Sequence, residues 1–267
     1  MDDLRLSADD ADVSLTISPE HGGRLTGLRI GDLEVIGRGG PRDVDWGCFA
    51  MVPFAGRIRN GLLRWQGQEH RLELGMPPHA IHGVGHDRPW TVLDSGTDHA
   101  TLRIDFDERW PWSGHALEHF ELSDSGLTAR LEVHADGAAM PSWTGFHPWF
   151  SRQLVSGGPA RIDITANGIL PRDGDGMPRP DAVPVAPEPW DDTFTGVTWP
   201  ASVTWDGALR LHIGADHPWA VVFTERPLAV CVEPQTGPPN AAELGLAATV
   251  EPGSPLALTM AWTWARL

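Results

Sequence analysis

The C-terminal stretch Leu256–Leu267, LALTMAWTWARL, carries the pattern that decides the fold class. Its large apolar side chains recur at every second position: Leu256, Leu258, Met260, Trp262 and Trp264. Successive side chains of a β-strand point to opposite faces, so this period of two predicts a strand with one buried face. The same alternation recurs along the chain in five further stretches: Val13–Ile17, Thr101–Phe106, Leu127–Ala135, Arg161–Thr165 and Leu209–Ile213.

Turn-forming residues separate these stretches, with 30 Gly and 24 Pro among 267 residues. Short strands joined by Gly and Pro turns are typical of an all-β sandwich or barrel. Helical pattern is nearly absent, and its best candidate, AAELGLAATV (Ala241–Val250), is long enough for little more than one turn. The Pro-rich segment Pro171–Trp190 is predicted to be a long surface loop inside one domain, because strand pattern continues on both sides of it.

Composition excludes several classes of function. The formal net charge is −16, and all 20 cationic residues are Arg, which argues against nucleic acid, anionic membranes and polyanions as partners. Without Lys the chain cannot form a Schiff base, and without Tyr it has no phenolic nucleophile or acid. Cys48 and Cys231 lie far apart among apolar neighbours, so we predict buried structural thiols rather than a disulfide framework or zinc cluster.

The N-terminal stretch MDDLRLSADD (Met1–Asp10) has neither a basic segment nor an apolar one, as a secretory signal peptide would. No stretch approaches eighteen consecutive apolar residues without charge, so no transmembrane helix is predicted. We therefore expect a cytoplasmic protein.

Two polar clusters interrupt the strand pattern in the first third of the chain. In PFAGRIRNG (Pro53–Gly61), Arg57 and Arg59 alternate with Ile58, so the spacing allows the two arginines to face opposite ways and one of them to point into a pocket. A salt-bridged surface arginine is the alternative, and the spacing does not decide between the two. The second cluster, PPHAIHGVGHDRPW (Pro77–Trp90), contains His79, His82, His86, Asp87 and Arg88. Its histidine spacings, like that of HALEH (His115–His119), match no common zinc signature, and we predict no metal.

Two further clusters follow apolar sequence. In TGFHPWF (Thr144–Phe150), His147 lies in an apolar setting, which suits either a buried, hydrogen-bonded histidine or a general acid. In AVCVEPQTGPPNA (Ala229–Ala241), an apolar strand delivers Glu233 at its end. A carboxylate there is either paired or functional, and desolvation would raise its pKa and make it a better base.

Tryptophan is unusually frequent, with 13 residues, and most are predicted to fill the core. Three stand beside the polar clusters and are candidates for stacking on a sugar: Trp90, Trp149 and Trp190. We find no phosphate-binding glycine motif and no G-x-S-x-G elbow. The residue types favour acid–base chemistry on a neutral, polyhydroxylated ligand.

The clusters, taken in order, resemble the motifs of the aldose 1-epimerase (galactose mutarotase-like) family. FAGRIRNG resembles its Asn-Arg-Ile-x-x-Gly stretch, AIHG its His-Gly motif, FHPWF its His-Pro-aromatic-Phe motif, and VEPQTGPPNA its Glu-centred motif. WDDTF (Trp190–Phe194) resembles the family's Asp-x-x-Phe segment. The resemblance implies one galactose mutarotase-like domain over residues 1–267, a large antiparallel β-sandwich with the sugar site on its concave face.

The resemblance also implies residue roles. Glu233 would be the general base for the C1 hydroxyl, and His147 the general acid for the ring oxygen. Arg57, His82 and Asp191 would hold sugar hydroxyls and the ring oxygen. Neither cofactor nor metal is implied, and a free sugar is the expected partner, with the chain acting as a monomer or homodimer.

Departures from the family pattern leave the substrate open. Gly56 stands where many members have Asn, and Trp149 where Tyr is common. One alternative is a hexose-6-phosphate 1-epimerase, with Arg88 and His86 supplying a phosphate site. Others are a non-catalytic carbohydrate-binding module of the same fold and a glycosidase that uses Glu233 and Asp191 as paired carboxylates.

Overall fold

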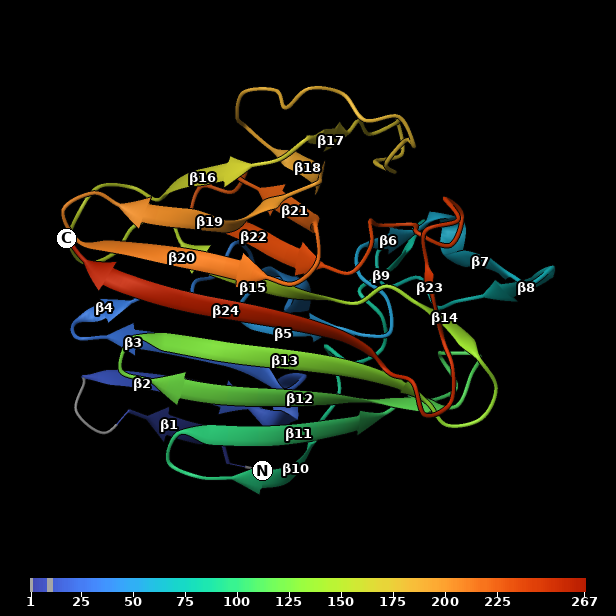
Figure 1. Ribbon diagram of the computed structural model, residues 1–267, viewed down its shortest axis with the longest axis horizontal. Helices are drawn as coiled ribbons and strands as arrows, with labels where there is room; N and C mark the ends of the chain where they lie inside the picture. The colour runs from blue at the N-terminus through green and yellow to red at the C-terminus, as the bar shows by residue number, and fades with distance from the viewer. Residues whose placement is uncertain (1, 9–11) are drawn as a thin grey trace.

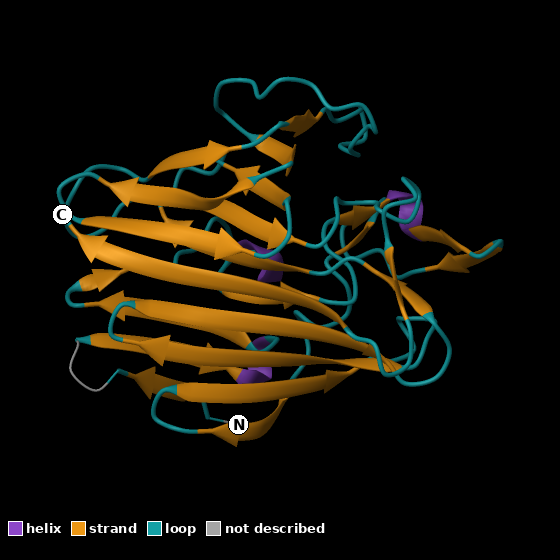
Figure 2. Cartoon of the chain, in the orientation of Figure 1, coloured by secondary structure: helices purple, strands orange, loops and turns teal. Residues whose placement is uncertain are grey.

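The computed structural model describes residues 2–8 and 12–267, and β-strands form nearly all of its regular structure (Figure 2). The larger sheet, called here the first sheet, has the strand order β1-β2-β3-β5-β15-β22-β21-β18-β17, with β4 paired to β3. All its pairings are antiparallel. Its strands are β1 (Leu4–Ser7), β2 (Val13–Ser18), β3 (Arg24–Ile30), β4 (Leu33–Glu34), β5 (Cys48–Met51), β15 (Gly145–Ser151), β17 (Gly168–Leu170), β18 (Asp191–Thr195), β21 (Trp219–Phe223) and β22 (Ala229–Gln235).

The second sheet is also antiparallel and packs against the first, so that the two make a sandwich (Figure 1). Its strand order is β10-β11-β12-β13-β24-β20-β19-β16. The strands are β10 (Thr91–Ser95), β11 (His99–Asp105), β12 (Gly114–Ser123), β13 (Gly126–Ala135), β16 (Arg161–Thr165), β19 (Thr198–Trp205), β20 (Leu209–Ala215) and β24 (Leu256–Arg266).

The six stretches with period two are all strands, which confirms the predicted all-β class. In β24 the side chains of Leu258, Met260 and Trp262 are at most 1% exposed, and Leu256 and Trp264 pack at the margin of the same core. The two sheets meet through such residues, as where the Phe150 ring of β15 lies 5.3 Å from the Trp262 ring.

Three short two-stranded sheets and several loops gather at one end of the sandwich (Figure 1). They are β6 (Arg57–Ile58) with β9 (Ala80–Ile81), β7 (Leu62–Trp65) with β8 (Gln68–Arg71), and β14 (Met140–Ser142) with β23 (Ala248–Val250). Single 3-10 turns occur at η1 (Pro19–His21), η2 (Asp43–Asp45) and η3 (Arg59–Gly61). The Pro-rich segment Pro171–Trp190 is a loop, as predicted, and the candidate helix Ala241–Val250 is a series of turns followed by β23.

The central strands of the first sheet are buried on both faces. Every residue of β5 and β22 is buried, without the alternation of buried and exposed positions seen in β12 and β13. One face lies on the sandwich core, and loops cover the other. A polar side chain on the loop-covered face is therefore removed from water while still lying on a rigid strand.

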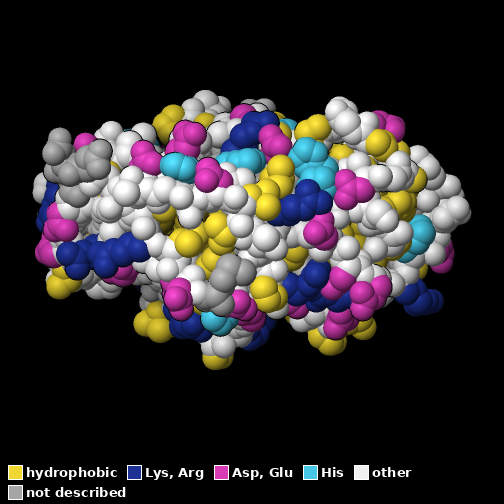
Figure 3. Space-filling model, turned by 90° about the horizontal axis from the view of Figure 1, so that it is seen from below, with side chains coloured by type: hydrophobic (Ala, Val, Ile, Leu, Met, Phe, Trp, Pro, Cys, Tyr) yellow, Lys and Arg dark blue, Asp and Glu magenta, His cyan; other side chains and the backbone are white. Residues whose placement is uncertain are grey.

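Among the described residues, no helix has the length and apolar character needed to cross a membrane. On the face shown in Figure 3, basic side chains lie in small groups beside acidic ones rather than in one continuous basic area.

Candidate active site

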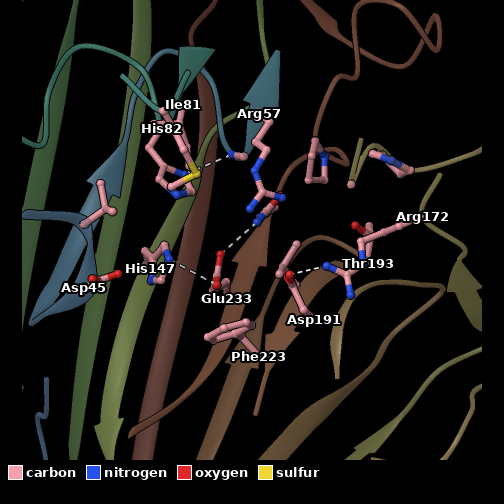
Figure 4. A pocket seen from close by; sticks show the side chains of 18 of the residues that line it. Asp45, Arg57, Ile81, His82, His147, Arg172, Asp191, Thr193, Phe223 and Glu233 are labelled. Atoms are coloured by element: carbon pink, nitrogen blue, oxygen red, sulfur yellow. Dashed lines mark hydrogen bonds and ion pairs between the residues drawn. The ribbon is translucent and has the colours of Figure 1, made fainter. Parts of the chain in front are cut away.

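Strand register brings His147 and Glu233 together. Strands β15 and β22 are antiparallel neighbours whose register pairs Gly145 with Gln235 and Trp149 with Cys231, which places His147 opposite Glu233. Because side chains alternate between the two faces, both point to the loop-covered face. The distance from His147 Nε2 to Glu233 Oε1 is 3.4 Å (Figure 4). The two groups stand 86 positions apart in the sequence, and the sheet brings them into contact.

The imidazole of His147 is held between two aromatic rings. Phe49, its cross-strand partner on β5, stacks at 4.8 Å between ring centres, and Trp149, two residues along β15, stacks at 5.2 Å. The residue is only 6% exposed. Burial lowers the pKa of His147 from its usual 6.5 to about 3, because the charged imidazolium loses its hydration.

Burial has the opposite effect on the pKa of Glu233. This residue is 3% exposed, and desolvation raises the pKa of its carboxyl well above the usual value, with the negative charge of Asp191 adding to the rise. The cation of Arg57 and a 3.4 Å hydrogen bond from Gln235 Nε2 to Glu233 Oε2 act against it. We predicted Glu233 at the end of its strand, which is wrong: β22 continues two residues farther, to Gln235.

A second buried histidine, His82, lies beside the pair. Its ring centre is 5.1 Å from that of His147, in an edge-on arrangement. Burial, with a smaller effect of His147, lowers the pKa of His82 well below 6.5. His82 Nδ1 accepts a 3.2 Å hydrogen bond from the Gly56 backbone N–H, which places the proton of the neutral ring on Nε2.

Gly56 is required by this arrangement. Its φ of +69° lies in the left-handed region, and a Cβ there would approach the Pro239 ring to 2.5 Å. An Asn side chain at position 56, as in many family members, has no room in this backbone.

The five predicted site residues all line one pocket that is open to solvent: Arg57, His82, His147, Asp191 and Glu233. Two arginines that we did not predict also line it, and each is held by a carboxylate: Arg42 by Asp45 and Arg172 by Asp191. Arg57 has no ion pair with any carboxylate that the structure describes. The pocket therefore offers one uncompensated cation beside the buried pair (Figure 4).

Other candidates lie elsewhere. Arg59 begins η3 and pairs with Asp173 and Asp175 of the Pro-rich loop, so the two arginines of the motif do face different surroundings. Arg88 pairs with Asp107, and His86 with Asp43, and neither lines the pocket, so the suggested phosphate site at Arg88 and His86 is wrong. His79 accepts a hydrogen bond from the Asn60 backbone N–H.

One of the three tryptophans proposed to stack on a ligand lines the pocket, Trp149. The prediction for Trp90 is wrong, because this residue is 0% exposed and donates its indole N–H to the Gly85 carbonyl. Trp190 packs edge-on against Phe194 and donates to the Ala186 carbonyl, outside the pocket lining.

Sequence reasoning missed several residues of the pocket wall: Arg42, Asp45, Arg172, Phe223 and Gln235. Gln235 could have been found, because it stands two residues after Glu233 on the same strand face. Arg42, Asp45 and Arg172 carry no such signal, since they reach the pocket from turns and loops whose path is set by tertiary contacts.

Two groups of side chains that the structure describes have the donor types and spacing to hold a metal ion. In the pocket floor, ligand atoms of His147, Cys231 and Glu233 lie within 4.8 Å of one another. On the outer face of the second sheet, Asp105, His115 and Asp136 form a comparable exposed group.

A sequence model of the family "Aldose 1-epimerase" matches residues 4–263, and the chain belongs to this family. Two Escherichia coli (strain K12) proteins, both described as uncharacterized, are similar in sequence. YphB is 32% identical over 110 residues, a match that covers 40% of this chain and 37% of YphB. YihR is 26% identical over 220 residues, covering 73% of this chain and 71% of YihR.

Solved structures show the same fold at low sequence identity. A GalM/aldose epimerase homologue from C. elegans superposes with a TM-score of 0.84 at 13% identity, covering 100% of this chain and 99% of that one. A galactose mutarotase-like protein from Clostridium acetobutylicum gives 0.84 at 17% identity, with 98% and 95% covered. Galactose 1-epimerase from Lactobacillus acidophilus NCFM gives 0.81 at 19%, with 99% and 94% covered. The predicted galactose mutarotase-like sandwich is thereby confirmed.

Proposed function

We propose that this chain is an aldose 1-epimerase that interconverts the α and β anomers of a free aldose by acid–base ring opening. The observation that carries the proposal is the contact between His147 and Glu233, a buried base and a buried acid whose side chains line one open pocket. Pairs of groups whose pKa values are pushed apart by their surroundings are typical of acid–base catalysis.

Ring opening needs one proton to leave and another to arrive. Glu233, as the carboxylate, takes the proton of the C1 hydroxyl while protonated His147 gives its proton to the ring oxygen, and the C1–O5 bond breaks as the carbonyl forms. After rotation about C1–C2, neutral His147 takes the proton back from the C5 hydroxyl. Protonated Glu233 then returns its proton to the new C1 oxygen. The pair holds one proton throughout, so the cycle restores its starting state.

The shifted pKa values fit a pair that shares one proton. Burial disfavours the charged form of each group, so the neutral form, with the proton on Glu233, is the state that acts on the open-chain aldehyde. The 3.4 Å contact lets the ion-pair form stabilise itself by mutual attraction, and this form acts on the ring. Arg57, His82 and Asp191 line the same pocket, and we assign them to the sugar hydroxyls and the ring oxygen.

Two alternatives are less well supported. A glycosidase that uses Glu233 and Asp191 would need two free carboxylates, but Asp191 is paired with Arg172, and the nearest titratable partner of Glu233 is His147. A carbohydrate-binding module would not need a buried acid–base pair. A hexose 6-phosphate is the second candidate substrate, because Arg57 faces the pocket without a carboxylate partner among the described residues.

The test is a substrate panel. Freshly dissolved α-glucose, α-galactose and glucose 6-phosphate are followed to anomeric equilibrium by polarimetry and by NMR at the anomeric proton, with and without the protein. Acceleration with a free sugar supports the proposal, and acceleration with the phosphate alone selects the second candidate. Binding of sugars with no acceleration of any of them would refute an epimerase and indicate a binding module.

A further inference from the structure

The pocket floor holds a third donor that the epimerase reaction does not use. Cys231 stands two residues before Glu233 on β22, so its side chain points to the same loop-covered face. The register places Cys231 opposite Trp149 and next to the row that holds His147 and Glu233. Ligand atoms of Cys231, His147 and Glu233 all lie within 4.8 Å of one another.

We propose that Zn²⁺, or another thiophilic divalent cation, binds in the pocket floor through His147, Cys231 and Glu233 and thereby blocks the site. Imidazole, thiolate and carboxylate are the ligands that Zn²⁺ takes in proteins, and three protein ligands leave a fourth position open to water or a sugar hydroxyl. The block rests on the proposed function, since the ion occupies the acid–base pair, whereas the binding does not depend on it.

The geometry is close to what the ion needs. Zn²⁺ bonds of about 2.0–2.3 Å in a tetrahedral arrangement put ligand atoms about 3.3–3.6 Å apart. The distance from His147 Nε2 to Glu233 Oε1 is already 3.4 Å, and the ligand atoms of all three residues lie within 4.8 Å of one another. Side-chain rotations that move an atom by about 1 Å close the remaining gap. All three ligands lie on neighbouring strands in the middle of the first sheet, so little backbone ordering is needed.

The pocket reaches the ion site but does not expose the thiol. Cys231 is 0% exposed and lies on the same sheet face as Glu233, in an apolar group with Trp149 and Phe223, which line the pocket. An ion that enters between His147 and Glu233 from the open side comes within reach of the sulfur, which belongs to the next row of the same sheet face. The thiol then gives its proton to solvent as the metal–sulfur bond forms, while His147 and Glu233 bind in their unprotonated forms.

The other cysteine supplies a matched control. Cys48, on β5, is also a buried free thiol, but it belongs to the apolar core between the two sheets, away from the pocket. His147 Nδ1 has no hydrogen-bond partner among the described residues, so the second-shell support that strengthens permanent zinc sites is missing. We therefore expect a reversible, inhibitory site rather than a resident cofactor.

The test combines binding with activity on the full-length protein. Cd²⁺ is titrated into wild type, Cys231→Ala and Cys48→Ala while the ultraviolet thiolate-to-metal charge-transfer band is recorded. Zn²⁺ is titrated in the mutarotation assay, with each variant compared with its own metal-free rate. We expect the band in wild type and Cys48→Ala but not in Cys231→Ala, and at least about a tenfold higher Zn²⁺ concentration for half inhibition in Cys231→Ala.

Further variants keep the result unambiguous. His115→Ala removes the exposed group of Asp105, His115 and Asp136, and the thiolate band must survive it. Cys231→Ser keeps the side-chain size, should the alanine variant fold poorly. Absence of the band from wild type, or equal Zn²⁺ sensitivity of wild type and Cys231→Ala, overturns the proposal. A wild-type band in a protein without mutarotation activity keeps the metal site and refutes the proposed function instead.

Discussion

Two histidine–carboxylate pairs of this molecule differ in their exposure to water and in the other groups that contact the carboxylate. His147 and Glu233 lie on neighbouring strands of the first sheet under a cover of loops, with side chains 8% and 4% exposed. His134 and Glu132 lie two residues apart on β13 of the second sheet, with a 3.1 Å contact and side chains 23% and 19% exposed. The residue types and the distances are nearly alike.

The pKa values of the two glutamates move in opposite directions. Burial raises the pKa of Glu233 well above its usual value. For Glu132 partial burial also favours a rise, but hydrogen bonds from Arg130 and His134 outweigh it and lower the pKa. A histidine beside a carboxylate is therefore no sign of catalysis by itself. The pKa of Glu233 is raised, unlike that of Glu132, because loops exclude water from Glu233 and no arginine hydrogen-bonds to it among the described residues.

The largest expected effect is on catalysis. Glu233→Gln removes the proposed general base while keeping the side-chain shape, and we expect the catalysed mutarotation rate to fall by about 10²–10⁴-fold. Glu132→Gln, the matched change in the exposed pair, should leave the rate within about twofold. Polarimetry on purified variants with unchanged circular dichroism measures both. An active Glu233→Gln enzyme would contradict the base assignment.

Replacing the proposed general acid, His147, should lower the catalysed rate by a similar factor. We expect His147→Gln to lower kcat by about 10²–10⁴-fold, with His134→Gln as the control in the exposed pair. Because the two groups of the buried pair act on one proton, the double variant His147→Gln/Glu233→Gln should be hardly slower than either single variant. Additive losses would show that the two residues act independently.

A substitution in the loops that cover the pocket tests how much their packing contributes to stability. Gly56→Ala places a Cβ against Pro239 and strains a backbone at φ +69°, and we expect it to lower the free energy of unfolding by about 1–3 kcal/mol. Gly67→Ala, in the exposed turn between β7 and β8, has a similar φ of +80° but no atom within 4 Å of its Cβ. Denaturant titration of both separates the cost of crowding from that of backbone strain. Equal losses would show that packing against Pro239 contributes nothing.

The smallest effects are on stability, and they should have opposite signs. A carboxyl whose pKa is raised by folding destabilises the protein as pH rises from the unfolded pKa through the folded one. Glu233→Gln should therefore be more stable than wild type at pH 8, by about 1–2 kcal/mol, and the gain should vanish below pH 4.

A lowered pKa stabilises above the unfolded value, so Glu132→Gln should lose stability at pH 8, by up to about 1 kcal/mol, and less in acid. Urea titrations at pH 4 and pH 8 give all four differences. Changes of the same sign in the two variants would contradict the contrast between the pairs.

Five of the eight strands of the second sheet could be predicted from sequence: β11, β13, β16, β20 and β24. One of their faces meets water, so hydrophobic and polar residues alternate, as from Leu127 to Ala135 and from Leu256 to Trp264. The strands that carry the site lack this pattern because both faces are buried, so the apolar run around Cys231 shows a strand but not its faces. The motif positions of His147 and Glu233, together with the family resemblance, located the site instead.

The pocket residues that could not be predicted from sequence are those whose positions depend on the paths of loops. Arg172 follows β17 in the Pro-rich segment, and nothing local shows that it turns toward Asp191. Trp90 and Trp190 stand beside motif residues in the sequence but point elsewhere, because adjacency along the chain does not fix the direction of a side chain in a loop. Only tertiary contacts decide which loop residues reach the pocket.

The pairing of β15 with β22 constrains the length of the strand that carries Glu233, whereas no such constraint acts on the loops at the pocket rim. Loss or gain of one residue between Ala229 and Glu233 would rotate Glu233 into the sandwich and present an aliphatic neighbour to the pocket, so this segment tolerates no change in length. The Pro-rich loop that brings Arg172 is free of that constraint. Relatives with other ligands are thus expected to differ in the length and the residue types of this loop, while the register of β15 and β22 stays the same.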